Sequence, residues 1–377
     1  MIRRARPVLA GLALVLVVGA CGTEDPTPTP GERSDSPSPT DAEDPGVSEE
    51  TGPVTPRITG DAATGLQAPW GLGFLPDGTA LVTERDTARV LAVTDDEVRV
   101  VATLEQAAPR GEAGLLGLAV SPTYDEDELV YLYLTTEQDN RVVRATFDGD
   151  RLGTPEVVLE GIPSAFIHDG GRIRFGPDDM LYVATGDASE PSLAPDAGSL
   201  AGKVLRITPD GDPAPDNPDP DSPVWTVGHR NIQGLTFDDE GRLWASEFGQ
   251  DAFDEVNLIE AGENYGWPQV EGKGDIDGLR DPARQWPTSE ASPSGLVFHE
   301  GSLWMAALRG QRLWQIPVRA DGSTGRPVPH FVGDHGRLRT VEVAPDGNLW
   351  LTTSNRDGRG DPGRQDDRIL VVELTRD

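Results

Sequence analysis

Residues 69–83 read PWGLGFLPDGTALVT. A short apolar run is followed by Pro-Asp-Gly and then by a second apolar run rich in residues that favour strands. A Pro-Asp-Gly turn supplies the backbone angles of a tight connection, with Gly taking the positive φ. The stretch therefore predicts a β-hairpin.

Five more stretches repeat this unit at intervals of 45 to 63 residues: GLLGLAVSP (114–122), GRIRFGPDDMLYV (171–183), GLTFDDEGRLW (234–244), GLVFHEGSLW (295–304) and VEVAPDGNLW (341–350). Such spacing fits four-stranded blades with loops of variable length. We predict an all-β fold, a six-bladed β-propeller of four-stranded antiparallel blades. A strand near Val54 to Ala62 is expected to close the ring beside Ile369 to Leu374. The alternative, a β-sandwich, does not require six similar hairpins in succession.

The N-terminus reads as an export signal. Arg3, Arg4 and Arg6 precede an apolar run from Val8 to Val18, and Gly19 and Ala20 precede Cys21, the single cysteine. The run is too short to span a bilayer, and its end matches a bacterial lipobox. We predict a signal peptide over residues 1–20 and a lipid anchor on Cys21. We expect residues 21–56 to form a Pro/Thr/Ser/Asp-rich tether and residues 57–377 to form the propeller. The anchor and tether would hold the propeller outside the cytoplasm, attached to the cell membrane.

The formal net charge of −32 argues against two classes of partner. An acidic surface repels nucleic acid and anionic lipid headgroups. We therefore expect no nucleic-acid partner, and membrane contact only through the lipid anchor.

Polar side chains are expected to converge at one end of the propeller channel. His168 precedes the first strand of the third unit and Asp187 follows its second strand, so a hairpin brings both to the same end. A carboxylate beside an imidazole orients it as a general base. A structural histidine is the alternative.

Other clusters occupy equivalent positions in later units. Arg230 and Asn231 precede the fourth unit, where guanidinium and amide groups suit a carboxylate or a developing oxyanion; a salt bridge between blades is the alternative. An acidic, glycine-containing loop over residues 247–257 offers the oxygen ligands that calcium prefers. Three further arginines predict an anionic ligand, unless they are solvated surface residues: Arg309, Arg337 and Arg339.

Taken together, these residues resemble the PQQ-dependent soluble glucose dehydrogenases and aldose sugar dehydrogenases. The resemblance covers essentially the whole domain. It is carried by GLLGLA (114–119), HDGGR (168–172) with Gly186-Asp187, GHRN (228–231) and NYGWP (264–268).

The resemblance implies oxidation of an aldose at C1 to its lactone, with hydride passing to C5 of pyrroloquinoline quinone (PQQ) and electrons to an external acceptor. It implies His168 as the base and Asp187 as its partner, with Arg230 and Asn231 at the quinone oxygens. It further implies that the cofactor is contacted by Glu112, His168, Arg309, Arg337 and Arg339. The carbonyls of Gly249 and Gln250 are implied to bind the catalytic calcium, and Glu255 and the Tyr265 carbonyl a second calcium. Trp286 and Asp187 are implied to contact the sugar.

Three positions depart from the family pattern: Gln250 stands where proline is common, Arg309 where a lysine stands, and Glu112 where a glutamine stands. A carboxylate near an anionic quinone needs an arginine or calcium to compensate it. Two alternatives remain open, a non-catalytic binding module on the same scaffold and a calcium-dependent lactonase. The sequence does not indicate which sugar, which electron acceptor, or whether the protein is a monomer or a dimer.

Overall fold

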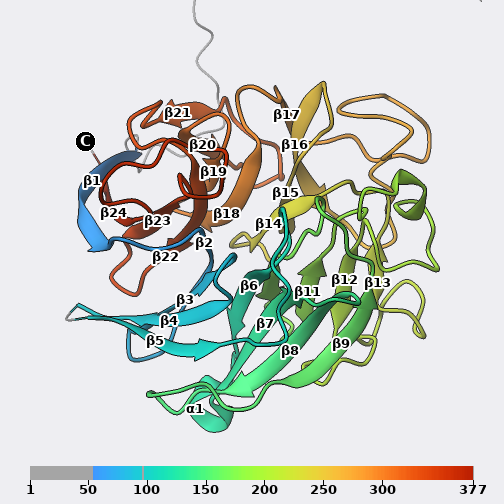
Figure 1. The fold of residues 1–377 in the computed structure, drawn as a ribbon. Helices are drawn as coiled ribbons and strands as arrows, with labels where there is room; N and C mark the ends of the chain where they lie inside the picture. The colour runs from blue at the N-terminus through green and yellow to red at the C-terminus, as the bar shows by residue number, and fades with distance from the viewer. Residues whose placement is uncertain (1–53, 96, 377) are drawn as a thin grey trace, which may run out of the picture. The chain divides into compact units, whose positions relative to one another are not determined.

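The computed structural model describes residues 54–95 and 97–376. They form six four-stranded antiparallel sheets arranged around a central axis (Figure 1), which confirms the predicted six-bladed β-propeller. The predicted signal peptide, Cys21 and the tether up to residue 53 lie outside the described residues. No helix of the described part is long and apolar enough to cross a membrane.

Each of the first five blades is built from four strands that follow one another along the chain. The first blade contains β2 (Pro69–Phe74), β3 (Ala80–Glu84), β4 (Arg89–Val93) and β5 (Val98–Thr103), and the second contains β6 (Leu115–Val120), β7 (Leu129–Thr135), β8 (Asn140–Thr146) and β9 (Glu156–Ile162). The third contains β10 (Ile173–Phe175), β11 (Leu181–Ala184), β12 (Val204–Ile207) and β13 (Val224–Thr226), and the fourth contains β14 (Ile232–Phe237), β15 (Leu243–Glu247), β16 (Phe253–Ile259) and β17 (Arg284–Pro287). The fifth contains β18 (Pro293–His299), β19 (Ser302–Ala307), β20 (Arg312–Pro317) and β21 (Val328–His330). The short helices α1 (Tyr124–Asp127) and η1 (Pro191–Leu193) lie in loops.

The sixth blade joins the two ends of the domain. It contains β22 (Leu338–Val343), β23 (Leu349–Thr353), β24 (Ile369–Arg376) and, on its outer edge, β1 (Val54–Ala63). β1 pairs with β24 in antiparallel register from Val54 opposite Arg376 to Ala63 opposite Ile369. The predicted closure of the ring is therefore confirmed. The strand begins at Val54, so residues 54–56 belong to the blade and not to the predicted tether, because their backbone completes the sheet.

Each repeated sequence unit contains at least half of the innermost strand of one blade and, except in the second unit, at least the start of the strand beside it. The innermost strands are β2, β6, β10, β14, β18 and β22, and each packs beside the next around the channel. Their glycines allow this approach: a Cβ on Gly117 would lie 2.1 Å from the carbonyl oxygen of Gly171, and one on Gly295 would lie 2.7 Å from Cα of Thr340. The repeated Gly-Leu of the sequence thus reflects close contact between neighbouring blades.

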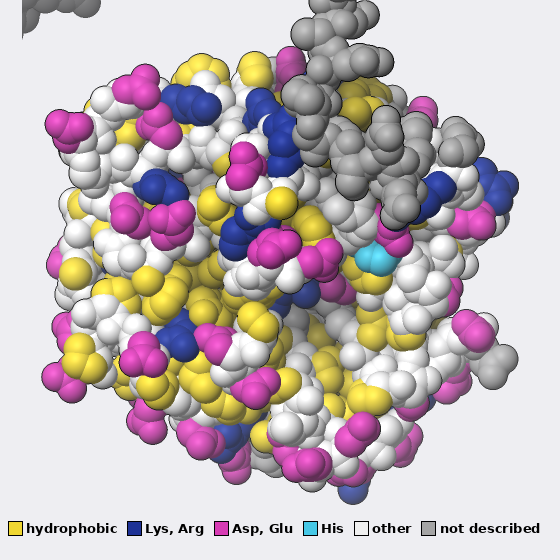
Figure 2. Space-filling view, turned by 180° about the vertical axis from the view of Figure 1, so that it is seen from behind, with side chains coloured by type: hydrophobic (Ala, Val, Ile, Leu, Met, Phe, Trp, Pro, Cys, Tyr) yellow, Lys and Arg dark blue, Asp and Glu magenta, His cyan; other side chains and the backbone are white. Residues whose placement is uncertain are grey.

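The common direction of the innermost strands gives the channel two different ends. We call the end where these strands begin the proximal mouth and the end where they finish the distal mouth. Acidic side chains are spread over the face of the propeller drawn in Figure 2.

Candidate active site at the proximal mouth

A histidine–aspartate pair lies at the proximal mouth, as the hairpin argument predicts. Nδ1 of His168 is 2.7 Å from Oδ1 of Asp187. The Asp187 side chain is fully buried and also accepts hydrogen bonds from the backbone N–H of Ser189 (2.8 Å) and from Nε1–H of Trp267 (2.8 Å). With Asp187 accepting the Nδ1 proton, Nε2 of His168 is left as a proton acceptor.

Arg230 enters the site with most of its guanidinium uncommitted. Its backbone N–H donates to Oε1 of Glu247 at 2.5 Å, and its side chain lies over the ring of Trp267, 5.5 Å from the centroid. Its Nε is buried and has no hydrogen-bond partner among the described residues. Burial lowers the pKa of Arg230, while Asp187 and Glu247 oppose that shift. A buried donor without an acceptor is costly, so this geometry fits a ligand that supplies one.

Buried polar residues hold the loops on either side of Arg230. Oδ1 of Asn231 accepts the backbone N–H of Gly170 at 3.0 Å, which ties the fourth blade to the loop that carries His168. His229 is fully buried, with Nδ1 2.8 Å from Glu247 and its ring stacked on Tyr265. The structure thus brings Asn231 beside the site, where its oxygen serves the protein backbone.

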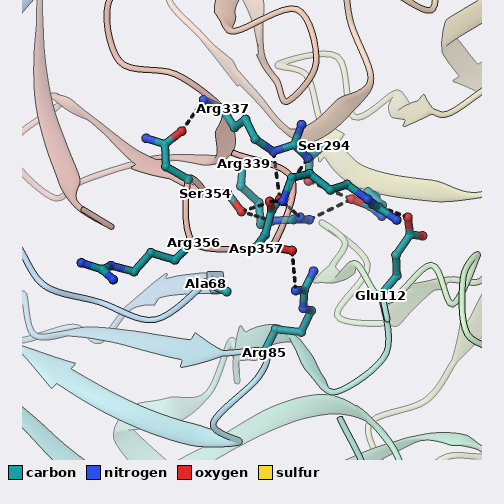
Figure 3. A network of polar contacts seen from close by, with 12 residues as sticks. Ala68, Arg85, Glu112, Ser294, Arg337, Arg339, Ser354, Arg356 and Asp357 are labelled. Carbon is teal, nitrogen blue, oxygen red and sulfur yellow. Dashed lines mark hydrogen bonds and ion pairs between the residues drawn. The ribbon is translucent and has the colours of Figure 1, made fainter. Parts of the chain in front are cut away.

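Five arginines and Glu112 help to line a cavity of about 140 Å³ at this mouth; the arginines are Arg85, Arg309, Arg337, Arg339 and Arg359. Asp357 lies between Arg85 on one side and Arg337 with Arg339 on the other (Figure 3), and Nη2 of Arg337 is 2.9 Å from its Oδ2. Burial opposes ionisation of Asp357, but Arg339 and Arg337 hold its pKa below the usual range. Burial, reinforced by Arg85, lowers the pKa of Arg339 to about 10. The cavity wall therefore carries more positive than negative charge in a strongly acidic protein.

Glu112 is compensated by an arginine, one of the two possibilities that the sequence suggests. Its Oε1 lies 2.7 Å from Nη1 of Arg359, and its Oε2 accepts the backbone N–H of His168 at 3.1 Å. Burial alone would raise the pKa of Glu112, but the bonds from Arg359 and His168 lower it.

The predicted calcium-binding loop is held by two carboxylates. Oε1 of Glu271 accepts the backbone N–H groups of residues 250–253 at 2.7 to 3.0 Å, and Oδ1 of Asp254 accepts that of Gly249 at 3.0 Å. The backbone N–H groups of this loop therefore donate to carboxylates of the protein, and these hydrogen bonds fix the conformation of the loop. Gln250 is exposed, and its backbone is part of this arrangement.

A second, smaller cavity lies beside this loop and is lined by Gly249, Glu255, Tyr265, Glu247 and Arg230, among others. Burial, and then the neighbouring Glu247, raise the pKa of Glu255 to about 8. Near it, the buried Oδ1 of Asn257 has no partner among the described residues. A cation placed here would relieve both features, and oxygen donors of this kind suit calcium. In the described part of the chain, no three His, Cys, Asp or Glu side chains gather as a metal-binding cluster, so the fit depends on backbone and amide oxygens as well as on Glu255.

Trp286, which the resemblance assigns to the sugar, lies outside the two cavities described above. It is on β17, the outermost strand of its blade, is 5% exposed, and packs on Trp314 with ring centroids 5.7 Å apart. Because β17 is the outermost strand of its blade, the structure does not bring Trp286 to these cavities, and its contact with the sugar stays a prediction.

Five residues of the site are not predicted from the sequence: Arg85, Trp267, Glu271, Asp357 and Arg359. Arg85 directly follows β3, where the chain enters a loop of the proximal mouth. The residues after β11 and β19 occupy the equivalent place in their blades, and this equivalence is what could have identified Arg85 from the sequence. Trp267 belongs to the motif NYGWP but has no assigned role there. Arg359 lies in the long loop before β24, where no repeat indicates its position.

Comparison with known proteins agrees with this geometry. Residues 66–370 match the family described as glucose / sorbosone dehydrogenase. The structure of the PQQ-bound aldose sugar dehydrogenase of Streptomyces coelicolor is 51% identical, with a TM-score of 0.83 over 86% of this chain and 99% of that one. Quinoprotein glucose dehydrogenase B of Acinetobacter calcoaceticus is 34% identical over 56% of this chain and 52% of its own length. Aldose sugar dehydrogenase YliI of Escherichia coli is 28% identical over 78% of this chain and 89% of its own length. This chain belongs to the glucose / sorbosone dehydrogenase family.

Proposed function

We propose that the protein is a PQQ- and calcium-dependent aldose dehydrogenase that oxidises the C1 hydroxyl of a sugar to the lactone and delivers the electrons to an external acceptor. Family membership and the PQQ-bound relative support this function. The single observation that carries it is the arginine-rich wall of the proximal cavity, together with the buried Nε of Arg230 that has no partner among the described residues. An anionic ligand with several carboxylates and ring oxygens satisfies both.

The residues of the chain supply the proton chemistry. Nε2 of His168 accepts the proton of the C1 hydroxyl, and Asp187 fixes the ring and stabilises the imidazolium that forms. Arg230 donates to oxygens on which negative charge grows. When bound, the quinone supplies the hydride acceptor, and calcium polarises its carbonyl group.

The residues proposed to hold these groups are those that the family resemblance implies. Arg309, Arg337 and Arg339 would bind cofactor carboxylates, and Glu112 would contact the cofactor from the opposite wall. The carbonyls of Gly249 and Gln250 would bind the catalytic calcium. Glu255 and the carbonyl of Tyr265 would bind a second calcium, and ionisation of Glu255 would accompany that binding.

Export and lipid anchoring belong to the same proposal. A signal peptide ending before Cys21, and a polar tether after it, would place the propeller outside the cytoplasm, where an external electron acceptor is accessible.

Reconstitution tests the proposed function. The apoprotein is incubated with PQQ and calcium chloride, and reduction of an artificial dye is measured with a panel of aldoses. We expect a change in quinone absorbance on binding and dye reduction that requires sugar. Binding without turnover on any aldose would instead indicate a non-catalytic binding module, and lactone hydrolysis without PQQ would indicate a lactonase.

A further inference from the structure

The ion pair between Glu112 and Arg359 spans the wall of the proximal cavity. We propose that Arg359 is a further cofactor-binding residue, that Glu112 positions it, and that the pair couples cofactor binding to the backbone of the catalytic base. This inference rests on the proposed function, because it concerns the anionic quinone at that site. Glu112 lies before β6, whereas Arg359 lies in the loop of residues 354–368 between β23 and β24, so the contact joins the second blade to the sixth.

The two oxygens of Glu112 have separate tasks. Oε2 accepts the backbone N–H of His168 at 3.1 Å, and Oε1 accepts Nη1–H of Arg359 at 2.7 Å. The side chain of Glu112 is 17% exposed, so its position is constrained by both contacts and by packing. A displacement of Arg359 therefore acts on the carboxylate that also holds the main chain of His168.

Arg359 keeps donors available for a ligand. Arg337 commits Nε and Nη2 to Asp357, at 3.0 and 2.9 Å, whereas the described contacts of the Arg359 side chain involve Nη1 alone. A guanidinium has five N–H donors and binds carboxylates in a bidentate manner. The Arg359 side chain is 52% exposed and lines the cavity, so its remaining donors are accessible to a cofactor carboxylate.

The backbone of Arg359 is anchored to the same acid that organises the other arginines. Oδ1 of Asp357 accepts the backbone N–H of Arg359 at 3.0 Å, while Oδ2 contacts Arg337 and Arg339. One carboxylate thus contacts the side chains of Arg337 and Arg339 (Figure 3) and the backbone of Arg359. This arrangement ties the backbone of Arg359 to the arginine cluster, while its side chain contacts Glu112 of the second blade.

Electrostatics explain why a glutamate is compatible with this wall. An isolated carboxylate facing an anionic ligand repels it, and the repulsion is stronger where water is excluded. Paired with Arg359, Glu112 contributes no net charge to the cavity. Removal of Arg359 should therefore weaken cofactor binding twice, by losing a cation and by exposing an anion.

A double-mutant cycle tests the coupling. The dissociation constant of PQQ is measured by calorimetry, at saturating calcium, for the full chain and for R359A, E112Q and E112Q/R359A. We expect R359A to weaken binding about 50-fold, E112Q to change it less than about 3-fold, and E112Q to restore about 10-fold of the affinity in the R359A background. R364A, an exposed arginine of the same loop, is the matched control and should bind PQQ as the unmodified chain does.

Two outcomes overturn the inference in different ways. If the unmodified chain binds PQQ but R359A binds equally well, Arg359 does not bind the cofactor. If R359A weakens binding and E112Q gives no rescue, the proposed coupling between the two residues is refuted. If the unmodified chain does not bind PQQ, the proposed function fails and this inference fails with it. Thermal unfolding of the cofactor-free variants shows whether the substitutions alter folding. A loss of PQQ affinity caused by misfolding of R359A would not be restored by adding E112Q.

Discussion

The two mouths of the channel are built from the same six innermost strands, but their arginine side chains differ in how far carboxylates of the protein pair them. At the distal mouth, a cavity of about 290 Å³ is lined by the ends of β2, β6, β10 and β22, and Nη2 of Arg174 contacts both oxygens of Glu342, at 2.7 and 2.5 Å. At the proximal mouth, five arginines help to line the cavity, and Nε of Arg230 has no partner among the described residues. Trp70 lies between the two, within 4.3 Å of the guanidinium of Arg172 and 6.0 Å of that of Arg339, measured to the ring centroid.

This contrast indicates where a ligand contributes to the site. Proteins pair buried charges unless another molecule completes the pairing. Arg174 has its carboxylate within the fold, and Arg172 donates to the carbonyl of Gln233 and the hydroxyl of Thr340. At the proximal mouth, Arg337 and Arg339 share Asp357, Arg85 pairs with Asp86, and Arg359 pairs with Glu112. The five arginines of the cavity thus face three carboxylates, which leaves positive charge for an anion. The following predictions separate the two mouths.

The largest effect is expected for His168→Ala. Loss of the base should lower kcat about 1,000-fold with PQQ still bound, because general base catalysis contributes factors of this size. Steady-state dye reduction and PQQ titration measure the two quantities on the same preparation. R174A at the distal mouth is the control and should retain turnover. If His168→Ala keeps more than about a tenth of the activity, the base lies elsewhere.

The second prediction concerns Asp169, beside the base. Its Oδ2 is buried without a partner among the described residues, and burial raises its pKa from 3.8 to about 6. The folded state therefore binds this proton more tightly than the unfolded state, and stability decreases as the pH rises from about 4 to about 6. The full shift corresponds to about 3 kcal/mol. Urea unfolding at several pH values should show this loss in the unmodified chain and not in Asp169→Asn; parallel curves for the two proteins would contradict the assignment.

The propeller and its base could be predicted because they depend on repeated geometry. Six similar hairpins fix the number of blades, and the entry and exit of one hairpin must lie at the same end, which places His168 beside Asp187. The ring closure by β1 follows from the same count, since the last repeat supplies too few strands for a blade.

Residues outside the repeat could not be placed in this way. Arg359 lies in the loop of residues 354–368, whose path depends on Asp357 and on Glu112 of another blade. The resemblance alone indicates Trp286 as a sugar contact, and the structure shows its strand to be the outermost of the blade, with its ring packed on Trp314. Sequence position along a blade predicts the mouth, whereas distance from the axis depends on strand order and tertiary packing.

The third prediction sharpens the contrast between the arginines. Arg309 is exposed at the proximal cavity, so Arg309→Ala should weaken PQQ binding about 10-fold, the loss of one charged hydrogen bond. Arg309→Lys keeps the charge but not the planar guanidinium group, so its PQQ affinity should lie between those of the unmodified chain and Arg309→Ala. R174A should leave the dissociation constant unchanged. Equal losses for R174A and Arg309→Ala would mean that the effect is a long-range change in charge and not a contact.

The smallest effect is expected for Glu342→Gln at the distal mouth. The side chains of Arg174 and Glu342 are 27% and 16% exposed, so solvent screens the pair and its loss should cost about 1 kcal/mol of unfolding free energy. PQQ affinity and kcat should not change, because Trp70 and the polar groups around it separate the mouths. Calorimetric binding and urea unfolding of one preparation test both parts. A changed PQQ affinity at unchanged stability would show that charge at the distal mouth reaches the cofactor pocket, and the independence of the two mouths would have to be abandoned.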